Sequence, residues 1–152
     1  MRIGILTLYY GNHNFGGQLQ AYALCTYLNQ QKNIECEQIA YDYKEKTVQS
    51  IKSRLFSVYS HVFHPRVMIG LNKRKKTFET FEEAIPHSIV VQSADELAQL
   101  TQKYDYVFTG SDQVWNPEYA GKMFYLGEIP AEKRCAYAAS LDVYKRQNNG
   151  FD

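Results

Sequence analysis

RIGILTLYYGNHNFGGQLQAYALCTYLNQQK, residues 2–32, is the stretch that decides the fold. Its first seven residues form a short apolar run, which is typical of a strand buried on both faces. A polar loop with three glycines follows at residues 9–17, and apolar residues then recur at helical spacing through residues 18–32. A second strand is expected over residues 34–43. Strand, loop, helix and strand within about forty residues predict a βαβ unit, which forms a parallel sheet.

The rest of the chain continues this alternation of strands and helices. Ser93 and Glu96 have the spacing of a capping box, which predicts that a helix begins there. The expected further elements are helices at 51–63 and 93–102, a short strand at 88–91, and buried strands at 104–109 and 134–139. The predicted fold class is therefore α/β, with a parallel sheet flanked by helices.

The composition is that of an ordinary globular protein and excludes disordered and collagen-like classes. Of 152 residues, 45% are hydrophobic and 22% are charged. The net charge of +1 provides no global field for a nucleic acid. No apolar run approaches the roughly 20 residues that span a bilayer, and the N-terminus lacks the pattern of a signal peptide. The three widely spaced cysteines, Cys25, Cys36 and Cys135, predict inert thiols in the cytoplasm.

The last twelve residues, 141–152, are expected to be a non-native tail. Residues 142–147 spell DVYKRQ, which GAT GTG TAT AAG AGA CAG encodes. That string matches the end sequence of transposon-based sequencing adaptors. Such segments are excluded from fold reasoning, so residues 1–140 are taken as one domain of a partial protein.

Two polar loops, at residues 11–17 and 110–116, each follow a predicted strand. If these strands are parallel in one sheet, both loops lie at its carboxyl edge, where open α/β sheets bind ligands. The side chains that would surround this crevice are Asn12, His13, Asn14, Ser111, Asp112, Gln113 and Asn116.

The first loop supports two interpretations. Gly16 and Gly17 at the start of a helix would let a phosphate or carboxylate approach free backbone N–H groups. Alternatively, Asn14 caps the helix and the glycines make the turn. The loop contains neither dinucleotide-binding nor ATP-binding glycine motifs, which disfavours a nucleotide ligand. His13 is a candidate for acid–base chemistry or a bystander.

The second loop also supports two interpretations. Asp112 is placed to take a proton from a sugar hydroxyl while Trp115 stacks on the ring face. The alternative is that Asp112 accepts hydrogen bonds from local backbone N–H groups and Trp115 packs in the core. His61, His64 and His87 lack the spacing of metal ligands, so no metal is expected.

Residues 73–76, with the sequence KRKK, form a block of positive charge with Arg66 nearby. A solvated helix face or linker is the favoured interpretation. Contact with an anionic lipid-linked or phosphorylated substrate is the alternative, whereas nucleic acid is disfavoured because no recognised motif accompanies the block.

Several strings in this order resemble the polysaccharide pyruvyl transferase family, over nearly all of residues 2–140. They are IGILT (3–7), Asn12, NFG (14–16), LQAYAL (19–24), YDY (41–43), YD (104–105), GSDQVWNP (110–117) and YAAS (137–140). Relatives more often have a small apolar residue at Gly17 and continue with Phe-Gly where this chain has Leu141 and Asp142.

The resemblance implies the N-terminal half of a two-domain fold like that of the GT-B glycosyltransferases, in which two Rossmann-like halves face a cleft. Family members transfer a pyruvyl group from phosphoenolpyruvate to a sugar of a bacterial cell-surface polysaccharide or its lipid-linked precursor. They form a ketal and release phosphate. No cofactor is implied, because phosphoenolpyruvate is the donor substrate. The expected partners are this donor, a saccharide acceptor and the C-terminal domain of the same chain.

In this interpretation the two loops line the acceptor side of the cleft. Asp112 is the candidate base and His13 a second catalytic candidate. The expected substrate-binding residues are Asn12, Asn14, Gly16, Gly17, Ser111, Gln113, Trp115 and Asn116. The expected location is the cytoplasm, with contact at the inner face of the membrane left open. A non-catalytic domain on the same scaffold, binding a carbohydrate or a partner, is the alternative.

Overall fold

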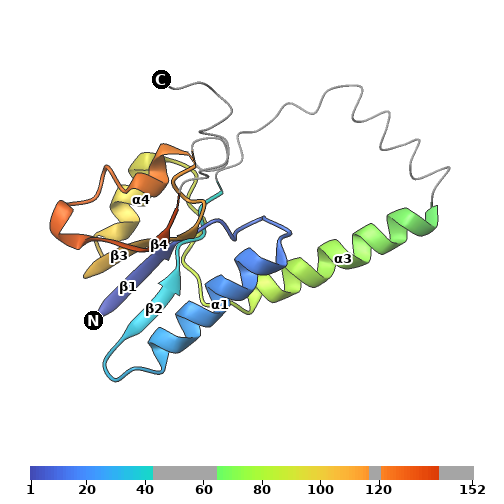
Figure 1. Cartoon of the computed structure of the whole chain (residues 1–152), viewed down its shortest axis with the longest axis horizontal. Helices are drawn as coiled ribbons and strands as arrows, with labels where there is room; N and C mark the ends of the chain where they lie inside the picture. Colours follow the sequence, from blue (N-terminus) through green and yellow to red (C-terminus); the bar gives the residue numbers. More distant parts are fainter. Residues whose placement is uncertain (43–64, 117–120, 141–152) are drawn as a thin grey trace.

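A computed structural model of the chain describes residues 1–42, 65–116 and 121–140, with only the backbone of Pro65 and Asp112. Four parallel strands form one sheet in the order β2-β1-β3-β4 (Figure 1). Their bounds are Arg2–Leu6 for β1, Glu35–Gln38 for β2, Tyr106–Asp112 for β3 and Arg134–Ala139 for β4. The predicted α/β class with an all-parallel sheet is confirmed.

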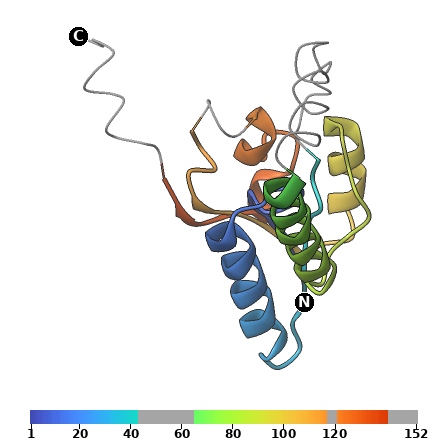
Figure 2. The ribbon, with the colours of Figure 1, turned by 90° about the vertical axis from the view of Figure 1, so that its right-hand side faces the viewer.

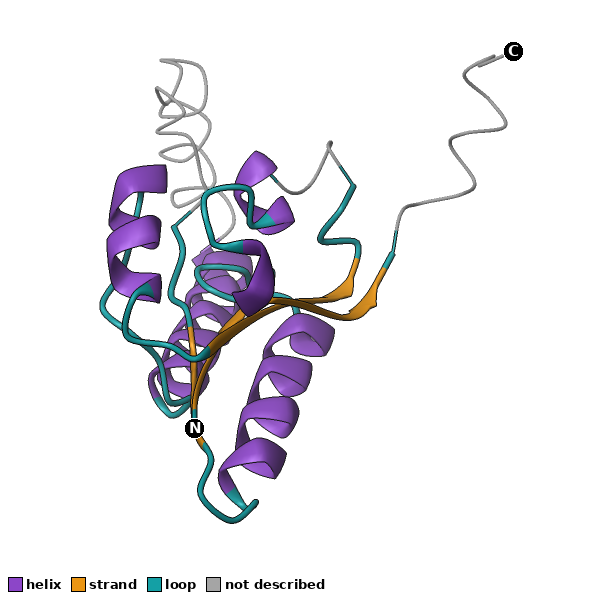
Figure 3. Ribbon diagram, turned by 90° about the vertical axis from the view of Figure 1, so that its left-hand side faces the viewer, coloured by secondary structure: helices purple, strands orange, loops and turns teal. Residues whose placement is uncertain are grey.

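Helices cover both faces of the sheet. They are α1 (Phe15–Asn29), α3 (Pro65–Glu83) and α4 (Ala94–Thr101), and the 3₁₀ turns are η1 (Lys122–Tyr125) and η2 (Ala131–Lys133). α1 lies against one face, whereas α4 and η1 lie on the other (Figure 3). α3 lies beside α1, as the view along its axis shows (Figure 2).

Alternation along β1 divides the core into two layers, because successive side chains of a strand point to opposite faces. Ile3 and Ile5 pack with Cys25 of α1 and Cys36 of β2. Leu6 points the other way and packs in a larger cluster. The other buried members of that cluster are Ile39, Val91, Leu97, Tyr104, Val107, Val114, Phe124, Leu126 and Ile129.

Side-chain caps fix the residues at which α1 and α4 begin. Ser93 caps α4 by accepting a hydrogen bond from the Glu96 backbone N–H at 3.2 Å, which confirms the predicted start. The Glu96 carboxylate accepts in return from the Gln92 N–H at 2.7 Å. α1 begins three residues earlier than predicted, because Asn14 is its cap and the glycine pair lies inside its first turn.

Several strand predictions are wrong in extent or burial. The strand expected over 34–43 is regular only from Glu35 to Gln38. From Gln38 onward, isolated parallel bridges join Gln38 to His87 and Tyr41 to Val91, so the strand expected at 88–91 does not form as a regular element. β4 was expected to be buried, but it pairs only with β3 among the described strands and is mostly exposed. The helix expected at 51–63 and the tail at 141–152 lie outside the described residues.

Gly4 of β1 is needed for packing against the ring of Tyr104, since a Cβ there would lie 2.7 Å from two ring carbons. Gly4→Ala should therefore destabilise the chain by about 1–3 kcal/mol through overpacking. Gly70, in the second turn of α3, is the matched control, because a Cβ there meets nothing within 4 Å. Gly70→Ala should stabilise by about 0.5–1 kcal/mol. Urea unfolding measures both changes; equal effects of the two substitutions would contradict this packing.

Candidate functional site

The two predicted loops lie at the same edge of the sheet. β1 and β3 are parallel neighbours in the register Ile3↔Tyr106 through Leu6↔Thr109. From β1 the chain passes into α1 on one face, and from β3 it passes into η1 on the opposite face. The carboxyl ends of β1 and β3 therefore flank a topological switch point, the place where open α/β sheets bind ligands.

A carboxylate from α3 holds the first loop. Glu82 Oε2 accepts a hydrogen bond from the Gly11 backbone N–H at 2.8 Å and another from the Gln18 amide at 3.3 Å. The side-chain amide of Asn12 donates to the Leu8 carbonyl at 3.4 Å, and the backbone N–H of Asn12 donates to the Tyr9 carbonyl at 3.1 Å. These bonds join the loop to α3 and to the end of β1, so its position is set by the fold.

Asn14 and the two glycines play structural roles at the start of α1. Asn14 Oδ1 accepts from the Gly16 N–H at 2.9 Å, and its carbonyl accepts from the Gln18 N–H at 3.1 Å. A Cβ at Gly17 would lie 2.9 Å from the Leu8 carbonyl oxygen, so glycine lets the helix start close to β1. The structural interpretation of this loop requires that Asn14 cap the helix and that the glycines serve the turn. The Asn14 cap and the close approach at Gly17 both agree with it.

His13 is exposed and lies in a cluster of aromatic rings and a cation. Its ring centroid is 5.6 Å from that of Phe78 on α3, which is 4.3 Å from the ring of Phe15. The Arg74 guanidinium lies 5.6 Å from the Phe15 centroid and 5.5 Å from that of Phe78, both within cation–π range. Arg74 therefore stands beside the first loop, a placement that the sequence did not predict.

Tyr9 lies fully buried beneath the first loop. Burial is the main cause that raises the pKa of its hydroxyl, and the nearby Glu82 carboxylate raises it further. Among the described residues, neither the Tyr9 hydroxyl nor Gln18 Oε1 has a hydrogen-bond partner. Tyr9 is therefore neutral at physiological pH, and the polar atoms under this loop are not all satisfied by the protein.

In the second loop, Gly110 and Asn116 shape the backbone. Gly110 has φ +131° and a Cβ there would overlap the Tyr137 carbonyl of β4, so only glycine fits. Asn116 is buried; its amide donates to Gln113 Oε1 at 3.2 Å and its N–H donates to the Gln113 carbonyl at 2.9 Å. Ser111 and Gln113 are half-buried.

Trp115 is half-buried and packs against the core cluster that surrounds Leu6, as the structural alternative for it requires. Its carbonyl accepts a hydrogen bond from the Tyr125 hydroxyl at 2.7 Å. Asp112 ends β3, where its backbone pairs with Ala139 of β4; its side chain lies outside the described part. The structure thus brings Asp112 to the carboxyl edge and leaves its proposed chemistry as a prediction.

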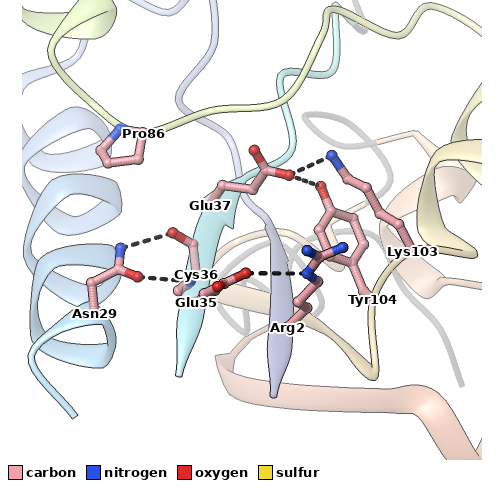
Figure 4. Close-up of a pocket in the computed structure, with 8 residues that line it drawn as sticks. All are labelled: Arg2, Asn29, Glu35, Cys36, Glu37, Pro86, Lys103 and Tyr104. Atoms are coloured by element: carbon pink, nitrogen blue, oxygen red, sulfur yellow. Dashed lines mark hydrogen bonds and ion pairs between the residues drawn. The ribbon is translucent and has the colours of Figure 1, made fainter. Parts of the chain in front are cut away.

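A pocket lined by charged residues lies at the opposite, amino-terminal edge of the sheet and was not predicted (Figure 4). Its volume is about 530 Å³. Glu37 occupies its centre, 2.6 Å from the Lys103 ammonium and accepting a 2.6 Å hydrogen bond from the Tyr104 hydroxyl. The remaining lining residues are Arg2, Asn29, Glu35, Cys36 and Pro86.

The charged groups of this pocket are paired with one another. Arg2 Nε lies 3.1 Å from Glu35 Oε2, and Asn29 exchanges two hydrogen bonds with the Cys36 backbone, at 2.7 and 2.8 Å. Burial raises the pKa of Glu37, but the hydrogen bonds from Lys103 and Tyr104 and the Lys103 charge outweigh it and hold the pKa below 4.5. Mutual pairing favours a structural role over ligand binding.

The basic block is exposed on α3, as the favoured interpretation of a solvated helix face requires. Within the described ranges, no three His, Cys, Asp or Glu side chains cluster as metal ligands would. None of the helices in those ranges is long and apolar enough to cross a bilayer.

No protein-family model, curated protein or solved structure matches the chain. The resemblance to pyruvyl transferases therefore stays a prediction that rests on the sequence motifs.

Replacing Asn14 tests the cap on α1. Asn14→Ala removes the acceptor for the Gly16 N–H and should cost about 1 kcal/mol of unfolding free energy. Asn14→Ser keeps a side-chain acceptor and should retain most of the stability. Urea unfolding of the two variants decides this, and equal losses would show that capping is not the role of Asn14.

Stability at acid pH should depend on Glu37. Its folded pKa lies below the unfolded value, so its contribution is present above pH 4.5 and is lost as the pH falls through the folded pKa. Unfolding free energies between about pH 6 and pH 3 should fall less steeply for Glu37→Gln than for the unmodified chain. Glu35→Gln, which alters an exposed ion pair, is the control and should keep the unmodified slope. An unchanged slope in Glu37→Gln would contradict the assignment.

Proposed function

We propose that the chain is the N-terminal half of a pyruvyl transferase. The enzyme would move the pyruvyl group of phosphoenolpyruvate to a sugar hydroxyl of a cell-surface polysaccharide or its lipid-linked precursor, in the cytoplasm. The observation that carries the proposal is the placement of the two motif-bearing loops. Residues 11–17 and 110–116 follow adjacent parallel strands and flank the switch point of the sheet.

The residue types at this edge suit a saccharide better than a nucleotide. Uncharged amides and a hydroxyl, from Asn12, Gln113 and Ser111, both donate and accept hydrogen bonds, as sugar hydroxyls require. The glycines that would suit a phosphate instead serve packing, since Gly17 approaches the Leu8 carbonyl. These features support assigning the acceptor, rather than the donor, to this half of the enzyme.

The proposed reaction needs proton transfer at both substrates. Protonation of C3 of phosphoenolpyruvate makes C2 electrophilic, and a sugar hydroxyl attacks C2 while it loses its proton to a base. A second hydroxyl then displaces phosphate and closes the ketal. The two hydroxyl protons balance the proton delivered to carbon and the one that leaves with phosphate. Asp112, at the end of β3, is the proposed base, and cations of the C-terminal domain are proposed to hold the donor.

A non-catalytic carbohydrate-binding domain is the second candidate. It is supported by the half-buried Ser111 and Gln113 at the carboxyl edge, whose uncharged side chains suit a saccharide whether or not a reaction follows. A binding role needs exposed amides and an aromatic face, but no base.

The complete gene product, incubated with phosphoenolpyruvate and a panel of p-nitrophenyl glycosides, separates these candidates. The transferase should release phosphate only when an acceptor is present, and the glycoside should gain the mass of pyruvate less one water. Glycoside binding detected by NMR without phosphate release or mass gain across the panel would favour the binding domain and overturn the proposed reaction.

Asp112→Asn in the complete enzyme tests the proposed base. The substitution keeps the size of the side chain but removes the proton acceptor, so kcat should fall by about 10²–10⁴-fold with little loss of stability. Glu132→Gln, at an exposed position of η2 just before β4 begins, removes a carboxylate at the opposite edge of the sheet and should leave kcat unchanged. If Asp112→Asn instead costs about 1 kcal/mol of stability and keeps kcat, Asp112 is a structural residue of the turn.

A further inference from the structure

The outer side of α1 carries a row of exposed apolar side chains on a helix that has no charge. Phe15 is 58% exposed, Leu19 55% and Tyr22 41%. With Thr26, these residues follow one another at intervals of four, three and four, so all of them lie along one side of the helix. None of the 15 residues of α1 is acidic or basic. Phe15, Leu19, Tyr22 and Thr26 are called the α1 stripe below.

A helix on the surface of a globular protein normally has charged residues on the side that faces water. The other side of α1 packs on the sheet, where Cys25 is buried with Ile3 and Ile5 of β1. A helix that packs on one side and is apolar and uncharged on the other is typical of a helix buried on both sides. Because burial of apolar side chains is favourable, we expect the α1 stripe to lie in an interface.

A small apolar cavity borders the α1 stripe in the groove between α1 and α3, two helices that lie side by side (Figure 2). Its volume is about 190 Å³. The residues that line it are Phe15, Gln18, Leu19, Thr77, Phe78 and Phe81. Tyr22 lies one turn further along α1, with its ring centroid 5.6 Å from that of Phe81. One surface therefore presents an apolar cavity and, beside it, a half-exposed aromatic side chain of the kind that fills such cavities.

The α1 stripe is complementary to itself when two copies run in opposite directions. Its intervals of four, three and four are the same from either end, so an antiparallel pair sets Phe15 opposite Thr26 and Leu19 opposite Tyr22. A twofold interface requires this kind of match, because both copies use the same patch. Tyr22 of the second copy then meets Leu19, which lines the cavity.

The charges beside the α1 stripe also favour opposite directions. At the amino end of α1, the Arg74 guanidinium of the basic block lies 5.6 Å from the Phe15 ring centroid. Toward the other end, where Tyr22 contacts Phe81, α3 finishes with the acidic residues 82–83. Neither helix has a basic residue in its last turn to offset the negative end of its dipole. An antiparallel pair brings the positive end of each copy toward the negative end of the other.

We propose that two copies of this chain associate through their α1 stripes, antiparallel about a twofold axis, with Tyr22 of each copy seated in the cavity between α1 and α3 of the other. The occupant is a second copy because one surface supplies the cavity, the aromatic side chain that fills it and both signs of charge. The inference rests on α1 and on residues 73–83 of α3, and it does not depend on the proposed reaction.

Analytical ultracentrifugation of the full chain over a concentration series tests the association. The chain should sediment as a monomer at low concentration and as a dimer at high concentration. Leu19→Lys places a charge at the centre of both stripes and should raise the dissociation constant of the dimer by about a hundredfold or more. Ile89→Lys, at a residue that is 75% exposed outside both helices, is the matched control and should sediment like the unmodified chain. Circular dichroism melts show whether each variant folds.

A second pair of variants tests the charges. Lys73→Glu reverses an exposed charge at the positive end of the interface and should weaken the dimer about tenfold. Lys122→Glu makes the same change at an exposed position of η1, on the opposite face of the sheet, and should leave the dimer unchanged.

Disulfide formation tests the antiparallel register. Chains that carry Leu19→Cys are mixed with chains that carry Tyr22→Cys, both in a Cys135→Ser background in which Cys25 and Cys36 are buried. Under mild oxidation, the disulfide between the two chains should form faster in the mixture than in Leu19→Cys alone. Faster crosslinking of Leu19→Cys with itself would indicate parallel stripes and overturn the proposal.

Three results of the sedimentation experiment would also overturn the proposal. The first is a monomer at every concentration, and the second is a dimer that Leu19→Lys weakens no more than Ile89→Lys does, because its interface would then lie elsewhere. The third is a loss of thermal stability in Leu19→Lys without any change in association, because the α1 stripe would then be covered within a single chain.

Discussion

The hydrogen-bonded pairing of β1 with β3 is the constraint on which the rest of the structure depends. It joins residues 3–6 to residues 106–109, about a hundred positions later, and creates the order β2-β1-β3-β4. Because the connection from β1 goes to one face and that from β3 to the other, this pairing creates the switch point. It also places Gly4 against Tyr104, so the core layer under α4 relies on the same register.

The same pairing gives the two edges of the sheet different characters. At the carboxyl edge, the loops end in amides, a hydroxyl and the backbone of Asp112, and polar atoms of Tyr9 and Gln18 lack partners in the described part. At the amino edge, Glu37, Lys103 and Tyr104 satisfy one another. A pocket whose charges are already paired has little to offer a ligand, which is why the two polar loops, rather than this pocket, carry the functional proposal.

The spacing of residues along the sequence correctly predicted those elements whose formation depends on interactions between near neighbours in the chain. The βαβ unit follows from the spacing of apolar residues in 2–43, and the α4 cap follows from Ser93 and Glu96. The burial of β4 was mispredicted because its apolar string RCAYAA does not reveal which strand pairs beyond it. The start of α1 was predicted too late because the two glycines were read as part of the turn before the helix. Gly17 is instead required by its close approach to the Leu8 carbonyl, a tertiary contact that the sequence pattern does not show. The position of Arg74 beside Phe15 depends on how α3 packs on α1. The two residues are 59 positions apart, so the spacing of residues along the chain does not predict their contact.

The meeting of the two loops at one edge is the central claim, and paramagnetic relaxation tests it most directly. In a Cys135→Ser background, with Cys25 and Cys36 buried, a spin label on Gln113→Cys reports on nearby amides. Amide signals of residues 11–17 should broaden more strongly than those of residues 29–35, at the opposite end of α1 and the start of β2. Stronger broadening of residues 29–35, or equal broadening of both segments, would contradict the shared edge and with it the proposed acceptor site.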